Sequence, residues 1–171
     1  MAIVPDPPLA ADGVVLRVRS DGDASWITEA YNDADIAQFI VGTPQPRRWA
    51  SATEAEFVIA DAARDEPLGL VSLRIADGDP GLAAVGYWLR QEARGQGAAT
   101  VAVQLIARWA FKELGVQRLE LTTAPKNVTS QRVAERAGFT REGVLRELTP
   151  ATKNNGRRDA VLYSLLPADL G

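Results

Sequence analysis

The sequence contains no cysteine and no histidine. Without cysteine there can be no disulfide, no thiolate nucleophile and no cysteine-ligated zinc site. Without histidine, the commonest general base and metal ligand of proteins is also missing. Any catalysis must therefore use carboxylates, hydroxyl groups, backbone groups or water, and we expect no metal site.

Strong charge and long apolar runs are also missing. The formal net charge of -3 provides no basic field of the kind that holds nucleic acid. No run approaches the ~20 apolar residues that a membrane-spanning helix needs. Residues 1–9 contain an aspartate and three prolines, unlike the basic and apolar segments of a secretory signal. We therefore expect a cytoplasmic protein without a nucleic-acid or membrane partner.

The composition is that of one folded domain. The 171 residues are 46% hydrophobic and 24% charged, which is ordinary for a soluble globular protein of this length. The proline-rich start is typical of a mobile segment. We expect a mobile N-terminal lead over residues 1–12 and a single domain over residues 13–167.

Hydrophobic periodicity predicts strands in the first half of the chain and alternating strands and helices in the second. The expected strands cover residues 14–18, 57–62, 68–75, 82–89, 119–123, 140–148 and 160–166. The expected helices cover residues 23–32, with Asp23 as a cap, 34–40, 97–114 and 128–137, and a polar turn is expected at 153–156. The predicted fold class is α/β (α+β), with about seven strands and about four helices in one domain.

The most informative segment is Arg94-Gly95-Gln96-Gly97-Ala98-Ala99, which joins the 82–89 strand to an amphipathic helix. Backbone N–H groups at a helix start point outward at its positive end, and glycines let a phosphate approach them. A pyrophosphate is the natural ligand, and a purely structural turn is the alternative. The segment lacks the pattern of a Walker loop or of a dinucleotide fingerprint.

Arg94, Gly97 and Ala99 match the Arg/Gln-x-x-Gly-x-Gly/Ala motif of the GCN5-related N-acetyltransferases (GNAT). The match continues through Tyr87-Trp88-Leu89 before the motif and Asn127, Ser130, Gly138-Phe139 and Glu142-Gly143 after it. This combination resembles the branch that contains the ribosomal-protein N-terminal acetyltransferases of the RimJ/RimL type. The similarity covers residues 14–166 in element order, and the sharp motifs occupy residues 86–143.

The resemblance implies that acetyl-CoA is the co-substrate and lies where the 82–89 and 119–123 strands splay apart. The motif loop would then hold the pyrophosphate, and the backbone of Leu89 would stabilise the oxyanion at the thioester. The cofactor-binding residues that the resemblance implies are Trp88, Leu89, Arg94, Gly95, Gln96, Gly97, Ala98, Ala99, Asn127 and Ser130.

Two side chains are candidates for catalysis. The resemblance implies that Ser130 protonates the departing thiolate, because Ala134 stands where many relatives have a tyrosine; a helix cap is the alternative. Glu147 is the candidate base, although Thr149 occupies the aligned position. Ordered water is the alternative proton acceptor.

The amine acceptor is expected to be a protein or peptide N-terminus, since an α-amine is about a tenth neutral at pH 7 without a strong base. A small molecule (antibiotic, amino acid or polyamine) and a non-catalytic acyl-CoA sensor are the alternatives. The expected acceptor contacts are Trp26, Tyr31, Phe39, Trp49, Arg146, Asp159 and Tyr163. The resemblance also allows a homodimer.

Overall fold

The computed structural model describes residues 4–6, 8–39, 53–151 and 156–170. Within these described residues, eight strands form one sheet in the order β1-β2-β3-β4-β5-β6-β8-β7. The strands are β1 (Leu9–Ala11), β2 (Val14–Arg17), β3 (Thr53–Asp61), β4 (Pro67–Ala76), β5 (Asp79–Leu89), β6 (Arg118–Thr123), β7 (Thr140–Thr149) and β8 (Arg158–Leu165). The helices are α1 (Ala24–Ala30), α2 (Ala34–Phe39), α3 (Ala98–Glu113) and α4 (Val128–Arg136), with short 3-10 turns η1 (Asp21–Asp23), η3 (Gln91–Ala93) and η4 (Pro167–Leu170).

The predicted fold class is confirmed, and each expected strand and helix has a counterpart. One strand was not predicted. Residues 9–11, inside the expected N-terminal lead, form β1 and pair antiparallel with β2 through the turn at Asp12 and Gly13. A three-residue strand is too short to show a period of two in the sequence. Positions 153–155 of the expected polar turn lie outside the described residues.

The start of α1 agrees with the prediction in position but not in bonding. Asp23 occupies the N-cap position of α1, but its side chain makes no cap hydrogen bond, and the turn η1, with Ser20 as its own N-cap, directly precedes the helix. The Asp23 carboxylate accepts hydrogen bonds from Arg17, from the Ser20 amide and from the Trp26 indole instead. A cap interaction with α1 is lost because these partners already use the carboxylate oxygens.

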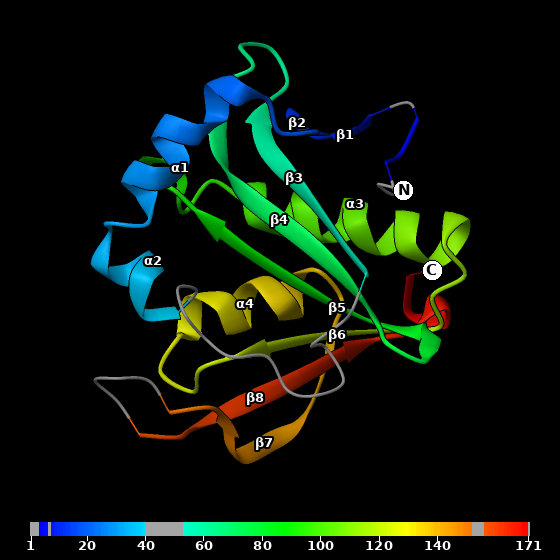
Figure 1. Ribbon diagram of the computed structural model, residues 1–171. Coiled ribbons are helices and arrows are strands. Elements are labelled where there is room, and N and C mark those ends of the chain that lie inside the picture. The colour runs from blue at the N-terminus through cyan, green and yellow to red at the C-terminus, as the bar shows by residue number, and fades with distance from the viewer. Residues whose placement is uncertain (1–3, 7, 40–52, 152–155, 171) are drawn as a thin grey trace.

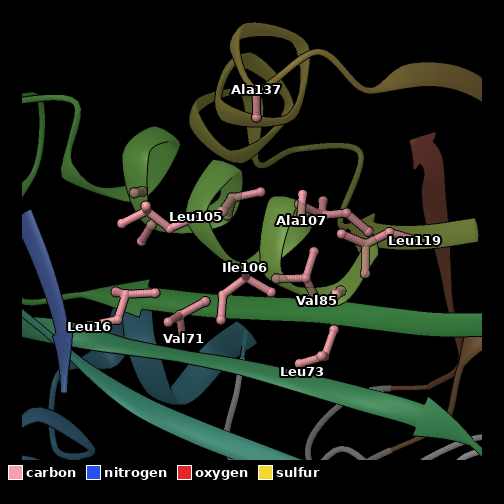
Figure 2. Close-up of a cluster of buried hydrophobic side chains, with 14 of the residues drawn as sticks. Leu16, Val71, Leu73, Val85, Leu105, Ile106, Ala107, Leu119 and Ala137 are labelled. Atoms are coloured by element: carbon pink, nitrogen blue, oxygen red, sulfur yellow. The ribbon is translucent and has the colours of Figure 1, made fainter. Parts of the chain in front are cut away.

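The two faces of the sheet carry separate hydrophobic clusters. Figure 2 shows Leu105, Ile106 and Ala107 of α3 above strand residues such as Val71 and Val85, in the larger cluster. The opposite face packs against α1 and α2 in a smaller cluster that contains Ile27, Ile36, Val58, Leu70 and Trp88. Neighbouring residues of β5 therefore face opposite sides of the sheet, with Leu89 toward α3 and Trp88 toward α1 and α2.

The centre of the sheet opens where β5 and β6 diverge. The two strands are parallel, as expected for strands joined through a helix. Their pairing runs only from Leu82 opposite Arg118 to Ala84 opposite Glu120, although β5 continues to Leu89 and β6 to Thr123. In Figure 1 the two strands separate toward the start of α3 and α4. The expected central splay is therefore present.

Within the described part of the chain, no helix combines the length and the apolar character that crossing a membrane would require.

Candidate active site

The backbone of β5 presents hydrogen-bonding groups to the gap beside β6. Arg90 donates its amide to the carbonyl of Leu68, and the register places Gly69 opposite Leu89. Bonded and non-bonded pairs alternate in an antiparallel ladder, so the N–H and C=O groups of Leu89 point away from β4 and toward the gap. The same alternation turns the backbone of Val85 and Tyr87 toward the gap.

The loop that begins α3 forms the end of this gap. Gly95 and Gly97 have positive φ angles of 77° and 85°, and a Cβ atom on either would meet open space. Among the described residues, no carbonyl or side-chain group accepts a hydrogen bond from the amides of residues 95–97. The 16-residue helix α3 adds the positive end of its dipole. The loop is therefore suited to bind an anion.

An open cleft of about 1240 Å³ connects the gap, the loop and the start of α4. Most residues that the sequence assigned to cofactor binding line this cleft. The cleft is lined by Trp88, Leu89, Arg94, Gly95, Gly97, Ala99, Asn127 and Ser130. Two predicted residues, Gln96 and Ala98, do not line the cleft. The Gln96 side chain donates to the Glu92 carbonyl (3.2 Å), and Ala98 is buried.

Arg94 lines the cleft, but its guanidinium group is already bonded to protein. It contacts the carboxylates of Asp33 (3.3 Å) and Asp35 (3.1 Å) at the start of α2 and the carbonyl of Leu89 (3.2 Å). The arginine of the motif therefore joins the glycine loop to α2, and its guanidinium group is engaged within the protein. The sequence does not show this contact because the paired residues lie 59 and 61 positions apart.

Ser130 lies in the cleft as the third residue of α4. Its amide donates to the side-chain oxygen of Asn127 (3.1 Å), which makes Asn127 the cap of the helix. Its hydroxyl accepts a hydrogen bond from the Tyr87 hydroxyl (3.1 Å). Burial raises the pKa of Tyr87, so the phenol stays protonated at neutral pH.

Tyr87 was not among the predicted catalytic residues. One feature of the sequence could have identified it: Tyr87 lies in β5 two residues before Leu89, and its side chain is therefore on the same face of the sheet. What the sequence does not show is that α4 brings Ser130 to that face, 43 positions away.

The structure does not bring Glu147 into the cleft. This residue is exposed and has a positive φ of 52° in a region where the pairing of β7 with β8 is irregular between Leu145 and Thr149. Its amide donates to Asp159 and its carbonyl accepts from Arg157. A bulge of this kind changes which face each side chain occupies, and simple alternation does not predict it.

Two of the expected acceptor contacts, Tyr31 and Asp159, line the cleft. Trp26 packs against Trp88 with ring centroids 5.8 Å apart, and Arg146 is exposed; neither lines the cleft. Tyr163 is fully buried and its hydroxyl donates to Glu135 (3.2 Å), so its expected role in acceptor contact is wrong. The side chain of Phe39 and all of Trp49 lie outside the described residues.

The carboxylates that line the cleft in the described part of the chain all have partners. In the described part of the chain these pairs are Asp35 with Arg94 (3.1 Å), Glu54 with Arg74 (3.1 Å), Glu56 with Arg19 (2.7 Å) and Glu120 with Arg118 (3.0 Å). Asp159 accepts the Glu147 amide at 2.8 Å.

Residues 6–140 match the acetyltransferase (GNAT) domain family. The chain belongs to this family. Two curated relatives from Bacillus subtilis are YjcK, provisionally named an N-acetyltransferase, and YdaF, provisionally named a ribosomal N-acetyltransferase. YjcK is 39% identical over 61% of this chain and 59% of its own length. YdaF is 37% identical over 57% of this chain and 52% of its own length. The chain thus spans little more than half the length of these relatives.

The GNAT fold is also shown by a solved structure, an acetyltransferase of the GNAT family from Bacillus anthracis. The TM-score is 0.78 over 93% of this chain and 98% of that chain, at 21% sequence identity. The family expected from the loop motif is therefore confirmed, and YdaF agrees with the RimJ/RimL-like branch.

Proposed function

We propose that this chain transfers the acetyl group of acetyl-CoA to a primary amine, namely the N-terminal α-amine of a protein or peptide, by direct attack in a ternary complex. The observation that carries this proposal is the position of the Leu89 amide. It points into the gap between β5 and β6 that ends at the amides of residues 95–97. An anion site and an oxyanion donor therefore share one cleft.

The residues of the cleft fit a CoA thioester. The absence of side chains at Gly95 and Gly97 leaves the room that a diphosphate needs beside the loop amides. Acetyl-CoA supplies an acetyl group activated as a thioester. The backbone of Val85 and Tyr87 offers hydrogen bonds to an extended pantetheine chain, and the Leu89 N–H stabilises negative charge on the thioester oxygen.

Ser130 and Tyr87 form a proton path on the other side of the gap. Because the Ser130 oxygen accepts from Tyr87, its own hydroxyl proton remains available for donation. A thiol of pKa about 8.5 is a moderate leaving group, so such a donor accelerates the reaction without being indispensable. The amine nitrogen attacks the carbonyl carbon and the C–S bond breaks. Ser130 gives its proton to the leaving sulfur and regains one from Tyr87. The proton released by the amine passes through solvent water and reprotonates Tyr87.

The engaged carboxylates favour an α-amine as acceptor. An α-amine of pKa about 7.7 to 8.0 is partly neutral at pH 7, whereas a lysine amine of pKa about 10.4 needs a base to release its proton. Within the described residues, the cleft offers no carboxylate without a partner for that task. YdaF, with its provisional ribosomal name, also supports a protein acceptor.

Release of free thiol from acetyl-CoA in the presence of different amines tests the proposal. The panel contains a lysine-free peptide with a free N-terminus, an Nα-blocked peptide with one lysine, an aminoglycoside and a polyamine. Turnover with the first peptide and not with the second supports an α-amine acceptor. Turnover with the aminoglycoside or polyamine alone overturns that acceptor in favour of a small molecule. CoA binding without thiol release from any amine overturns the enzyme and supports the sensor.

Ser130→Ala should lower kcat about 10-fold and leave the Kd for CoA unchanged, because the serine acts on the leaving sulfur. Tyr87→Phe should have a smaller effect in the same direction, since it removes only the donor to Ser130. Steady-state kinetics and calorimetric titration with CoA measure the two quantities. An unchanged kcat in Ser130→Ala would show that water protonates the thiolate.

A further inference from the structure

Gly69 of β4 stands opposite Leu89 in the sheet. A Cβ atom at this position would overlap the carbonyl oxygen of Trp88 and lie 2.9 Å from the Cα atom and 3.0 Å from the Cδ2 atom of Leu89. The φ angle of Gly69 lies outside the left-handed region. The position therefore requires glycine for space and not for backbone conformation.

This close approach sets Gly69 apart from the other glycines that the structure describes. It is the one among them whose Cβ atom would come within 3.0 Å of another atom. Gly86 and Gly81, both on β5, would meet their nearest neighbours at ordinary distances of 3.6 Å and 3.5 Å. The crowding is thus confined to the point where β4 contacts the end of β5.

The carbonyl of Trp88 and the amide of Leu89 belong to one planar peptide unit. In a trans peptide the two groups point in opposite directions, so the oxygen faces β4 and the N–H faces the gap. A side chain at position 69 would push the oxygen and rotate the whole unit. The orientation of the Leu89 N–H would change with it.

The neighbouring peptide cannot absorb this displacement easily. The Arg90 amide is bonded to the Leu68 carbonyl (2.8 Å), and the Leu89 carbonyl accepts from Arg94 (3.2 Å). Arg94 is itself held by Asp33 and Asp35. The end of β5 is therefore anchored directly after Leu89. A side chain at position 69 would consequently displace the Trp88–Leu89 peptide and not the residues that follow it.

We propose that Gly69 is a positioning residue for catalysis: the missing side chain allows β4 to hold the Trp88–Leu89 peptide at the angle that aims the Leu89 N–H at the thioester oxygen. This inference rests on the proposed function, in which that N–H stabilises the oxyanion. Gly69 itself touches neither acetyl-CoA nor the acceptor.

The variant Gly69→Ala tests this role. It should lower kcat about 10-fold, part of the 100-fold or greater loss that follows complete removal of an oxyanion donor. The Kd for CoA should stay unchanged, because the atoms nearest the new Cβ belong to Trp88 and Leu89 and not to the loop of residues 95–97, whose Arg94 is held by Asp33 and Asp35. Rates are expressed per CoA-binding site, so a smaller folded fraction does not mimic the effect. Gly81→Ala, on the same sheet and outside the cleft, is the matched control and should retain full kcat.

A second measurement separates positioning from general damage. Two CoA derivatives are titrated: a ketone in which a methylene replaces the thioester sulfur, and S-ethyl-CoA, which lacks the carbonyl. The ketone should bind more tightly than S-ethyl-CoA to the wild-type protein and to Gly81→Ala. In Gly69→Ala the ratio of the Kd for S-ethyl-CoA to the Kd for the ketone should fall toward one, because the Leu89 N–H no longer meets the carbonyl oxygen of the ketone. A preserved preference would overturn the inference.

The proposed function is tested separately by replacing the Leu89 N–H with an ester oxygen through backbone substitution. An unchanged kcat in this ester would refute Leu89 as the oxyanion donor, whatever Gly69→Ala does. A reduced kcat in the ester together with a normal kcat in Gly69→Ala would refute only the role of Gly69.

Gly69→Ala could yield no folded protein, and a second comparison covers that case. The double variant Gly69→Ala/Leu89→Ala is then compared with Leu89→Ala alone. Leu89→Ala removes the clash with the leucine side chain and keeps the clash with the peptide. The same 10-fold loss is expected there, and equal rates would overturn the inference.

Discussion

Gly97→Glu is expected to abolish CoA binding, with an affinity loss on the order of 100-fold or more. The new side chain would enter the open space beside the loop amides, where the diphosphate is proposed to lie. Two like charges about 4 Å apart repel by about 4 kcal/mol near a protein surface, which exceeds the ~2.7 kcal/mol of a 100-fold change. Calorimetric titration with CoA measures the loss.

The control for this substitution is Gly115→Glu. Gly115 follows α3 at its other end, has a similar positive φ of 71°, and its Cβ atom would also meet open space. Both variants therefore carry the same backbone strain, about 1–2 kcal/mol for a residue forced into this region. Only Gly97 lies in the cleft. Equal CoA affinities of the two variants would show that the loop does not hold the diphosphate.

The geometry of the loop could be predicted from the sequence because it is local. Gly95 and Gly97 act through the backbone of the segment in which they stand, and the amphipathic pattern of α3 follows directly after them. Helix start, glycine conformation and exposed amides are all consequences of a few consecutive residues. The parallel order of β5 and β6 was predictable for a similar reason, since a helix connects them.

The contacts that complete the site could not be predicted in the same way. Tyr87 meets Ser130, and Arg94 meets Asp33, only because distant elements pack together. A pattern of hydrophobic residues predicts which face of a strand is buried but does not predict which helix packs against that face. The wrong expectation for Tyr163 shows this limit, because its side chain is buried and its hydroxyl bonds to Glu135 of α4 and does not reach the cleft. Glu147 departs from simple alternation through a bulge.

The wall of the cleft nearest α1 depends on one buried carboxylate. The Asp23 side chain is 4% exposed and accepts a bidentate pair of hydrogen bonds from Arg17 (2.8 and 2.9 Å). It also accepts from the Trp26 indole (2.9 Å), and Trp26 packs against Trp88. Tyr31, which lines the cleft, packs against the same Trp88 ring at 5.7 Å. Asp23 therefore holds Trp26, which packs against the same Trp88 ring as Tyr31.

Asp23→Ala should destabilise the protein by about 3 kcal/mol, because it leaves the partly buried Arg17 without its main partner and the Trp26 indole without an acceptor. For a chain of this length the melting temperature should fall by about 10 °C. Thermal unfolding followed by circular dichroism measures the change. Asp65→Ala is the control, since Asp65 binds the same arginine from an exposed position and its loss should matter little.

The pH dependence of stability gives an independent check. The hydrogen bonds from Arg17 hold the pKa of Asp23 well below its usual value. A carboxylate with a lowered pKa in the folded state contributes stability that is fully present above its unfolded pKa of about 3.9 and is lost as the pH falls toward the folded value. Wild-type stability should therefore decline below about pH 4 more steeply than that of Asp23→Asn, which has no proton to take up. Identical declines of the two proteins in acid would mean that the Arg17–Asp23 pair does not stabilise the fold.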